Sequence, residues 1–178
     1  MRKKFQIPCP SGRRANSKFQ KFLGFTLIEL LVVISIIGVL SALLMANISG
    51  IRQRARDAKR KADLKAIKEA LRLYRNDCDS YPPDANDGNI IQGCGTCDAP
   101  VNCSWGESFS NANRTVYMNQ LPIDPLNTGD YIYHYDLVDR DNFRLWAVLE
   151  NVSDPEIAKS KAACQVGGNQ PYYYVCSD

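Results

Sequence analysis

The cysteines are the residues of this chain with the most clearly defined chemistry. Six of them follow residue 77, and a seventh, Cys9, lies in a basic N-terminal stretch. An even number of cysteines in an oxidising compartment is typical of disulfides, although the spacing alone leaves the pairing open. The six disulfide candidates are Cys78, Cys94, Cys97, Cys103, Cys164 and Cys176.

Two other cysteine chemistries are less well supported. Cys94 and Cys97 form a C-x-x-C pair, and Cys78 and Cys103 would complete the four thiolates of a tetrahedral zinc site. However, the second C-x-x-C pair of such sites is missing, and an oxidising compartment would not keep the thiols free. A redox-active C-x-x-C motif needs a thioredoxin-like strand and helix around it, which this stretch lacks. We therefore favour disulfides over a metal site.

Residues that could carry out catalysis are sparse. His134 is the only histidine, and no serine or acid near it forms a recognisable triad, so we interpret it as a surface or cross-strand residue. The sequence has no glycine-rich phosphate loop and no paired catalytic acids. These observations predict a protein that is not an enzyme.

One acid stands at a costly position. Residues 25–48 are 24 mostly apolar residues, and a helix needs roughly 20 to cross a bilayer. Glu29 lies inside this run, where a carboxylate costs about 2.5 kcal/mol or more. A simple interpretation is an acid at the helix start that stabilises the positive end of the helix dipole. The alternative is a carboxylate that is kept because a positive partner reaches it.

The distribution of charge predicts the orientation of this apolar segment. The whole chain has a net charge of +3, but residues 1–24 hold seven basic residues and no acid, which leaves 15 basic against 19 acidic residues from Phe25 onward. A basic flank before an apolar segment is typically cytoplasmic. The rest of the chain would then lie outside the cytoplasm, in agreement with the even number of cysteines. A plain signal anchor is the simpler alternative, since the apolar run is longer than the core of a cleaved secretory signal.

The stretch GFTLIELLVVISIIGVL, which begins at Gly24, resembles the N-terminal signature of type IV pilins and type II secretion pseudopilins. In that family a glycine, a phenylalanine and an acid hold fixed places at the start of an apolar helix. The resemblance implies that a prepilin peptidase cuts between Gly24 and Phe25 on the cytoplasmic side, and that the new N-terminal residue, Phe25, is methylated. It also implies that Glu29 serves assembly.

Electrostatics gives this arrangement a physical reason. A cut after Gly24 removes the seven positive charges of the leader and exposes the α-amine of Phe25. Phe25 and Glu29 are four residues apart, so they share one helix face. The carboxylate can neutralise the amine of its own chain or of a neighbour in a helical bundle, which would fix the register between subunits.

The elements that carry these residues can be outlined from the sequence pattern. Residues 25–76 are predicted to form one long helix, whose part from residue 51 is amphipathic. Its apolar stripe consists of Ile51, Ala55, Ala58, Ala62, Ala66, Ile67, Ala70, Leu71 and Tyr74. The basic residues between them are interpreted mainly as a solvated face, with Asp57–Lys61 and Glu69–Arg72 at pair spacing. Ion pairs between subunits and contact with DNA are less favoured, and the basic stretch raises the question of a lipid-headgroup site.

The C-terminal part is predicted to be a small sheet. The helix should end before Pro82 and Pro83, and strands are expected at residues 131–138, 143–150 and 172–176. A short helical turn is expected at residues 117–121. The fold class is therefore α+β, a long N-terminal α-helix packed on a small antiparallel β-sheet, as in pilins. The expected divisions are a basic leader at 1–24 that is removed, a transmembrane and filament-core helix at 25–50, and an extracytoplasmic pilin head at 51–178, with its amphipathic helix at 51–76, a cysteine-rich loop at 77–120 and the β-sheet at 121–178.

The resemblance has further implications for the head. Cys164 and Cys176 enclose the last loop, and C-terminal disulfides bridge such a loop in many pilins. Major type II secretion pseudopilins bind calcium in a C-terminal loop rich in glycine and aspartate, which residues 150–170 do not match. We expect no cofactor, and calcium is a less favoured option with Asp139 and Asp141 as candidate ligands.

The resemblance implies a structural subunit of a type IV pilus-like filament, which polymerises through its N-terminal helix after prepilin cleavage. Its partners would be other pilin subunits, the prepilin peptidase and methyltransferase, a membrane assembly platform and membrane lipid, whereas nucleic acid is less favoured. It would be a single-pass protein of the cytoplasmic membrane before assembly, and part of a periplasmic or extracellular filament afterwards. The missing calcium loop favours a pilus. The alternatives are a pseudopilin of a type II protein secretion system and an uncleaved, membrane-anchored binding domain.

Overall fold

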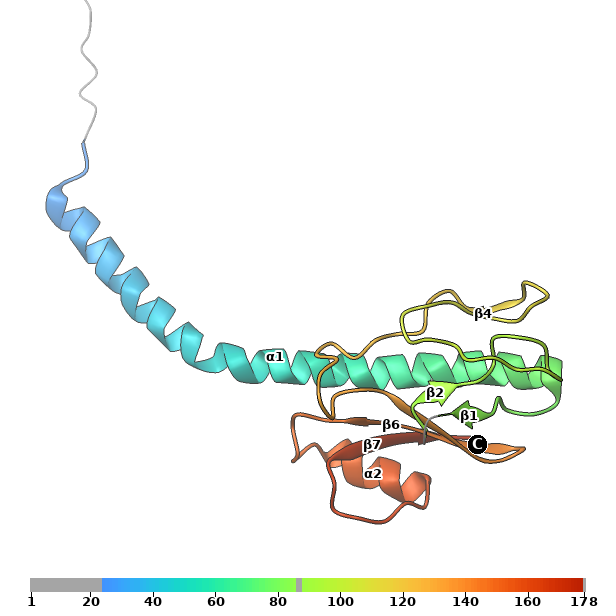
Figure 1. Ribbon diagram of the computed structural model, residues 1–178. Coiled ribbons are helices and arrows are strands. Elements are labelled where there is room, and N and C mark those ends of the chain that lie inside the picture. The colour runs from blue at the N-terminus through green and yellow to red at the C-terminus, as the bar shows by residue number, and fades with distance from the viewer. Residues whose placement is uncertain (1–23, 86–87, 178) are drawn as a thin grey trace, which may run out of the picture. The chain divides into compact units, whose positions relative to one another are not determined.

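The computed structural model describes residues 24–85 and 88–177 of the chain (Figure 1). The side chains of residue 43 and residues 45–47 are also outside the description. The predicted leader thus lies outside the described residues except for Gly24, and Cys9 lies outside with it. The chain divides into two units, Met1–Leu44 and Met45–Asp178, and the second is called the head below.

The first element is α1, Leu27–Cys78, which contributes to both units. It confirms the prediction of a long N-terminal helix and is helical through residues 45–50. Within residues 24–85 and 88–177, no helix combines the length and the apolar character that a membrane span requires.

The face of α1 that is buried in the head differs from the predicted stripe. The buried positions recur at steps of three and four and are Asp57, Arg60, Leu64, Ile67, Ala70, Leu71 and Tyr74. The stripe is therefore correct from Ile67 onward and wrong before it, because the earlier alanines are exposed. A leucine buries more apolar area than an alanine, and the two charged residues find ion-pair partners in the head.

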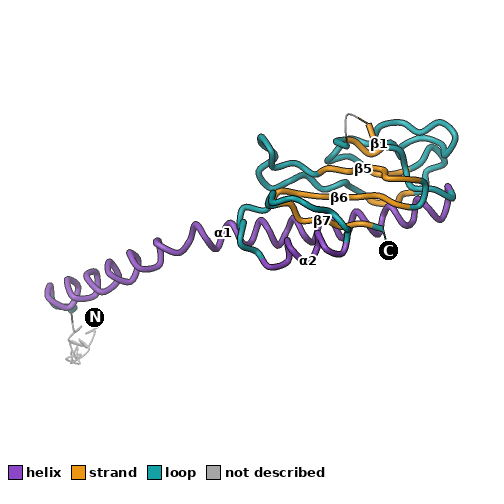
Figure 2. Tube along the Cα trace, turned by 90° about the horizontal axis from the view of Figure 1, so that it is seen from below, coloured by secondary structure: helices purple, strands orange, loops and turns teal. Residues whose placement is uncertain are grey.

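A three-stranded antiparallel sheet covers this face of α1. Its strands are β5, His134–Asp139, β6, Asn142–Val148, and β7, Tyr172–Cys176, in the order β5-β6-β7. Alternate side chains of the sheet, among them Tyr135, Leu145 and Val175, pack with Ile67 and Leu71 in one core. Figure 2 shows the three strands side by side. The predicted strands and the α+β fold class are confirmed.

A second helix, α2, Pro155–Ala163, was not predicted. The side chain of Asp154 caps it by accepting a hydrogen bond from the Glu156 N–H at 2.9 Å, and proline occupies its first turn. These start signals were present in the sequence, but the helix is short and buries only Ile157 and Ser160. It packs beside β7, where Ser160 Oγ accepts a hydrogen bond from the N–H of Tyr174 at 3.1 Å.

Two short hairpins complete the head. β1, Asp84–Ala85, pairs with β2, Ile90–Ile91, and β3, Phe109–Ser110, pairs with β4, Val116–Met118. The predicted helical turn at residues 117–121 is wrong, because Tyr117 in β4 packs against aromatic rings of the core. Its ring centroid lies 5.4 Å from that of Tyr74 and 5.0 Å from that of Phe109.

Candidate functional site

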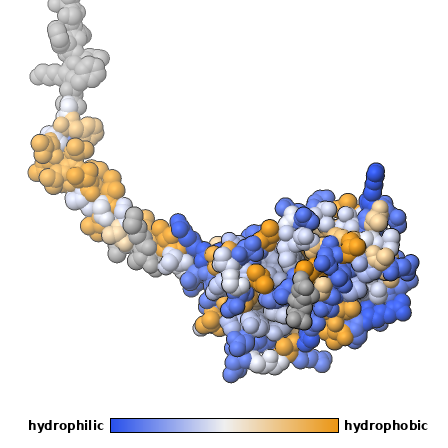
Figure 3. Space-filling view, in the orientation of Figure 1, coloured by the Kyte–Doolittle hydropathy of each residue, from blue (hydrophilic) through white to orange (hydrophobic). Residues whose placement is uncertain are grey.

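The first candidate site is the apolar surface of the N-terminal unit. Every large apolar side chain that the structure describes between residues 25 and 44 is exposed, from 91% at Phe25 to 47% at Val32. Figure 3 shows an almost continuous apolar surface here, whereas the visible face of the head is mixed. Folded proteins rarely leave so large an apolar surface uncovered in water. The segment is therefore built to contact lipid or other apolar helices.

Glu29 lies at the start of this surface and is part of a helix cap. Its Oε2 accepts hydrogen bonds from the N–H and from the hydroxyl of Thr26, both at 2.8 Å, while the Glu29 N–H donates to Thr26 Oγ1 at 3.3 Å. This reciprocal arrangement is a capping box, in which a threonine and a glutamate three residues later satisfy each other's free groups. In the uncut chain Glu29 thus acts as an acid at the start of the helix, which was the simpler of the two interpretations of this residue. Thr26 is a partner that the sequence analysis missed, although the T-x-x-E spacing was visible.

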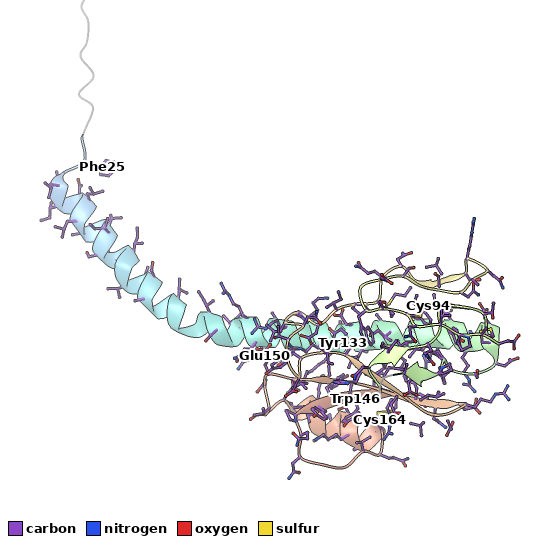
Figure 4. All side chains as sticks on the ribbon, viewed as in Figure 1. Phe25, Cys94, Tyr133, Trp146, Glu150 and Cys164 are labelled. Carbon is purple, nitrogen blue, oxygen red and sulfur yellow. A yellow bond between two sulfur atoms is a disulfide. The ribbon has the colours of Figure 1, made fainter. Side chains whose placement is uncertain are left out.

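The predicted cleavage site lies directly before the helix. Gly24 and Phe25 precede α1, and a side chain added at Gly24 would meet no atom within 4 Å. Figure 4 shows Phe25 just ahead of the helix start. An uncrowded peptide bond outside the helix suits a peptidase. Cleavage after Gly24, methylation of Phe25 and the assembly role of Glu29 remain predictions.

The second site is an ion network buried in the head, which the sequence analysis missed. Arg60 is completely buried, and its Nε and Nη2 donate to Asp124 at 2.7 and 3.0 Å. Its Nη1 donates to Asp57 at 2.7 Å and to Glu150 at 2.8 Å. Arg56 donates to both carboxylate oxygens of Glu150 at 2.6 Å. The prediction that these basic residues form a solvated face is therefore wrong for Arg60.

The network joins two loops to α1. Asp57 also accepts hydrogen bonds from the N–H groups of Glu150 and Asn151, at 3.0 and 2.9 Å. Asp124 lies before β5 and Glu150 follows β6, so both ends of the β5–β6 hairpin are held at neighbouring turns of the helix. Figure 4 places Glu150 beside α1, well apart from Cys94. The network fixes where the sheet sits along α1.

Hydrogen bonding keeps these groups charged. Burial alone would lower the pKa of Arg60, but the hydrogen bonds that it donates to Asp124, Glu150 and Asp57 raise it. The hydrogen bonds from Arg56 lower the pKa of Glu150 to about 2, against the opposing effect of burial and with further support from Arg60. Arg60 and Glu150 are therefore both charged at neutral pH.

The six candidate cysteines are paired in the structure. Cys78 bonds to Cys97, Cys94 to Cys103 and Cys164 to Cys176. The first bond ties the end of α1 to the cysteine-rich loop, and the third ties the end of α2 to β7. Among the described residues, no group of three or more histidine, cysteine, aspartate or glutamate side chains is arranged to hold a metal ion.

Comparison with known proteins identifies first the N-terminal motif and then the family. The family model described as the prokaryotic N-terminal methylation motif matches residues 20–45, a range that includes Gly24, Phe25, Thr26 and Glu29. The type II secretion system core protein G of Escherichia coli K12 is 36% identical over 111 residues, which are 61% of this chain and 69% of that protein. The chain belongs to this family. The core protein G of Klebsiella pneumoniae is 43% identical over 107 residues (60% of this chain, 70% of that protein), and that of Vibrio cholerae 32% over 116 residues (65% and 73%). No solved structure matches the chain.

Membership in the core protein G family confirms the resemblance to pilins and pseudopilins. The family is one of structural pseudopilin subunits, so the expectation of a pilin-like subunit is confirmed at that level. A type II secretion pseudopilin was the alternative to a pilus subunit that the sequence left open. Similarity to core protein G supports that alternative, although the calcium loop is not recognisable in this chain.

Proposed function

We propose that this chain is a filament-forming pseudopilin of a type II protein secretion system. Its role would be structural rather than enzymatic. The relatives named as core protein G support the type of apparatus. The contiguous exposed apolar surface of residues 25–44, with a single acid at its start, supports the filament and is the observation that carries the proposal.

Assembly would begin in the cytoplasmic membrane. The apolar surface of residues 25–44 would be covered by lipid while the subunit is anchored, and by the same segment of neighbouring subunits in the filament. Exchange of one apolar environment for another leaves little net hydrophobic driving force, so close packing and polar contacts decide the register. Glu29 is the acidic side chain that can provide such a contact in this segment.

Cleavage after Gly24 would create the partner of Glu29. In the uncut chain one carboxylate oxygen of Glu29 is used by Thr26. The second oxygen makes no hydrogen bond with the described residues, and it would accept the α-amine of Phe25 from the same or a neighbouring chain. A subunit in the correct register pairs this charge, whereas a misplaced subunit leaves it unpaired in an apolar surrounding, at a cost of several kcal/mol.

The partners follow from this sequence of events. They are other copies of the chain, the prepilin peptidase and methyltransferase, a membrane assembly platform and membrane lipid. The head would lie in the periplasm, an oxidising compartment that suits its three disulfides.

Two variants and a matched control test the proposal in cells that carry the secretion system. Gly24→Asp should leave Met1–Gly24 attached, and Glu29→Gln should be processed but give few filaments. Ser35→Ala is the control, because the Ser35 hydroxyl bonds only to carbonyls of its own helix, at 3.0 Å to Leu31 and 2.8 Å to Val32. The readouts are the N-terminal mass of the membrane-bound protein, the filament yield and the amount of secreted protein.

The outcomes separate the alternatives. A mature parent protein that begins at Phe25, with filaments and secretion lost together in Glu29→Gln, supports the proposal. If Glu29→Gln loses filaments but secretes as much protein as the parent, the filament would be a pilus rather than part of the secretion system. An intact Met1 in the parent protein would contradict cleavage and favour an anchored binding domain.

A further inference from the structure

Two arginines at the start of the head differ from the basic residues that follow them. Arg52 and Arg54 are exposed, and neither forms an ion pair with any residue that the structure describes. On the next turns of α1, by contrast, the basic side chains are paired. These pairs are Arg56–Glu150, Lys59–Asp63, the Arg60 network and Lys61 with Asp154 and Glu156.

The acids around this end of the head are turned inward. The side chains of Asp57, Asp124 and Glu150 are only 2%, 0% and 8% exposed. All three form ion pairs with Arg56 or Arg60. Asp130, next to Tyr131 whose ring covers Arg60, is an exposed acid nearby. With Asp130 included, the exposed charge without an ion-pair partner at this end is still net positive, because Arg52 and Arg54 together carry two positive charges.

Exposed aliphatic side chains lie at the same end. Ile51 is 63% exposed and precedes the two arginines, while Val152 is 70% and Leu126 37% exposed. The ion network holds the two loops that carry them. The N–H of Asn151, the residue before Val152, donates to Asp57 at 2.9 Å. The N–H of Leu126 donates to Asp124 at 2.9 Å. We call the surface formed by Ile51, Arg52, Arg54, Leu126 and Val152 the head base.

The position of the head base along the chain decides what can reach it. At about 1.5 Å per helical residue, residues 25–48 are about 36 Å long, slightly more than the roughly 30 Å of hydrocarbon in a bilayer. In an anchored subunit, Arg52 and Arg54 thus come at the depth of the lipid headgroups. Basic residues on the outer side of an apolar segment run against the usual charge bias. A contact that uses these charges would explain their presence.

We infer that the head base binds anionic phospholipid headgroups of the membrane that anchors the subunit before assembly. The inference rests on the proposed function, because it requires an anchored subunit. Arginine guanidinium groups bind phosphate oxygens in a forked geometry, and the aliphatic side chains enter the boundary between headgroups and acyl chains. This contact would hold the head upright on the membrane until the neighbouring subunits replace the lipid.

The test compares two tryptophan variants of the full-length, uncut chain in lipid vesicles. Val152→Trp places a fluorophore on the head base. Val138→Trp is the matched control, since Val138 is also exposed (51%) but adjoins the β5–β6 turn, where Asp141 pairs with Arg75 near the other end of α1. The vesicles contain lipids brominated near the headgroup, with either phosphatidylglycerol or phosphatidylcholine as the bulk lipid. Trp105 and Trp146 give the same background in both variants.

The expected result is bromine quenching of Val152→Trp above the background in phosphatidylglycerol vesicles, and none above background for Val138→Trp. Removing each arginine, as Arg52→Gln or Arg54→Gln, should lower the ratio of docked to undocked heads about fivefold. High salt should act in the same direction. The exposed Lys65 and Lys159, as Lys65→Gln and Lys159→Gln, serve as charge controls that leave the quenching unchanged.

Three outcomes would overturn the inference. Equal quenching of the two variants would show that the head base does not meet the membrane. Quenching that is independent of lipid charge and of both arginines would show that the anchor alone holds the head there. Quenching that rises with the ratio of protein to lipid would show that a second copy covers the head base. Flotation of the vesicles separates these outcomes from a failure of the proposed function, because a chain that floats with neither lipid is not anchored at all.

Discussion

Arg60 and Asp124 form a bidentate ion pair in which both side chains are fully buried, although 64 residues separate them in the sequence. The Nε–Oδ2 and Nη2–Oδ1 distances are 2.7 and 3.0 Å. Burying two charges costs several kcal/mol of desolvation, which the pair recovers only if every donor and acceptor is used. The main role of the network is therefore to fix the position of the β5–β6 hairpin on α1, and it adds little net stability.

Loss of the Asp124 carboxylate should strongly destabilise the head. Asp124→Ala leaves the Arg60 guanidinium buried with part of its charge unpaired, and we expect the free energy of unfolding to fall by about 3–5 kcal/mol. Denaturant titration of the detergent-solubilised chain, followed by the fluorescence of Trp105 and Trp146, measures this change. Asp130→Ala, which removes an exposed acid, is the control and should change stability by less than about 0.5 kcal/mol. Equal effects of the two variants would contradict the assigned role of Asp124.

Stability of the head should depend on the protonation of Glu150. The pKa of Glu150 is lowered from 4.5 to about 2 by hydrogen bonds from Arg56 and Arg60. A carboxyl group whose pKa is lower in the folded state adds stability above its unfolded pKa. That stability is lost as pH falls from about 4.5 towards 2. Unfolding curves at several pH values should show a smaller loss over this window in Glu150→Gln, whose stability is already reduced at pH 7. Parallel pH profiles of parent and variant would count against this effect.

Local patterns predicted the long helix and the three strands of the main sheet, because β5, β6, β7 and the part of α1 in the head bury side chains at regular spacing. β7 was visible in residues 172–176, and the core face of α1 was visible from Ile67 onward. The capping box of Thr26 and Glu29 and the start of α2 also had local signals, which were overlooked beside the stronger apolar pattern.

Long-range partners could not be predicted in this way. The charges of Asp57 and Arg60 suggested only contacts along the helix. The partners Asp124 and Glu150 follow Arg60 by 64 and 90 residues, and no local pattern indicates that they fold back onto it. The pairing of the other four cysteines had the same difficulty, because six cysteines permit many connectivities, whereas the resemblance to pilins suggested the Cys164–Cys176 bond.

Removing the last disulfide should destabilise the C-terminal part of the head. Cys164 and Cys176 are 12 residues apart, and a loop of this size is worth about 3 kcal/mol when it is closed in the unfolded chain. The double variant Cys164→Ser, Cys176→Ser should therefore unfold at lower denaturant concentration, with the other two disulfides still closed. Mass spectrometry of alkylated protein checks that they are. If the parent protein loses no stability when this one bond is removed, the bond does not form in the cell or does not restrain the unfolded chain.

Leu71 and Leu73 test which face of α1 the sheet covers. The two leucines are two residues apart on the same helix, yet Leu71 is completely buried in the core whereas Leu73 is 51% exposed. Leu71→Ala removes a core side chain and should lower the free energy of unfolding by about 2–5 kcal/mol. Leu73→Ala should change it by less than about 0.5 kcal/mol, because alanine is also a good helix former. Both values come from the same fluorescence titration. A larger loss in Leu73→Ala than in Leu71→Ala would mean that the sheet packs on the opposite face of the helix, and the register of the Arg60 network would then be wrong as well.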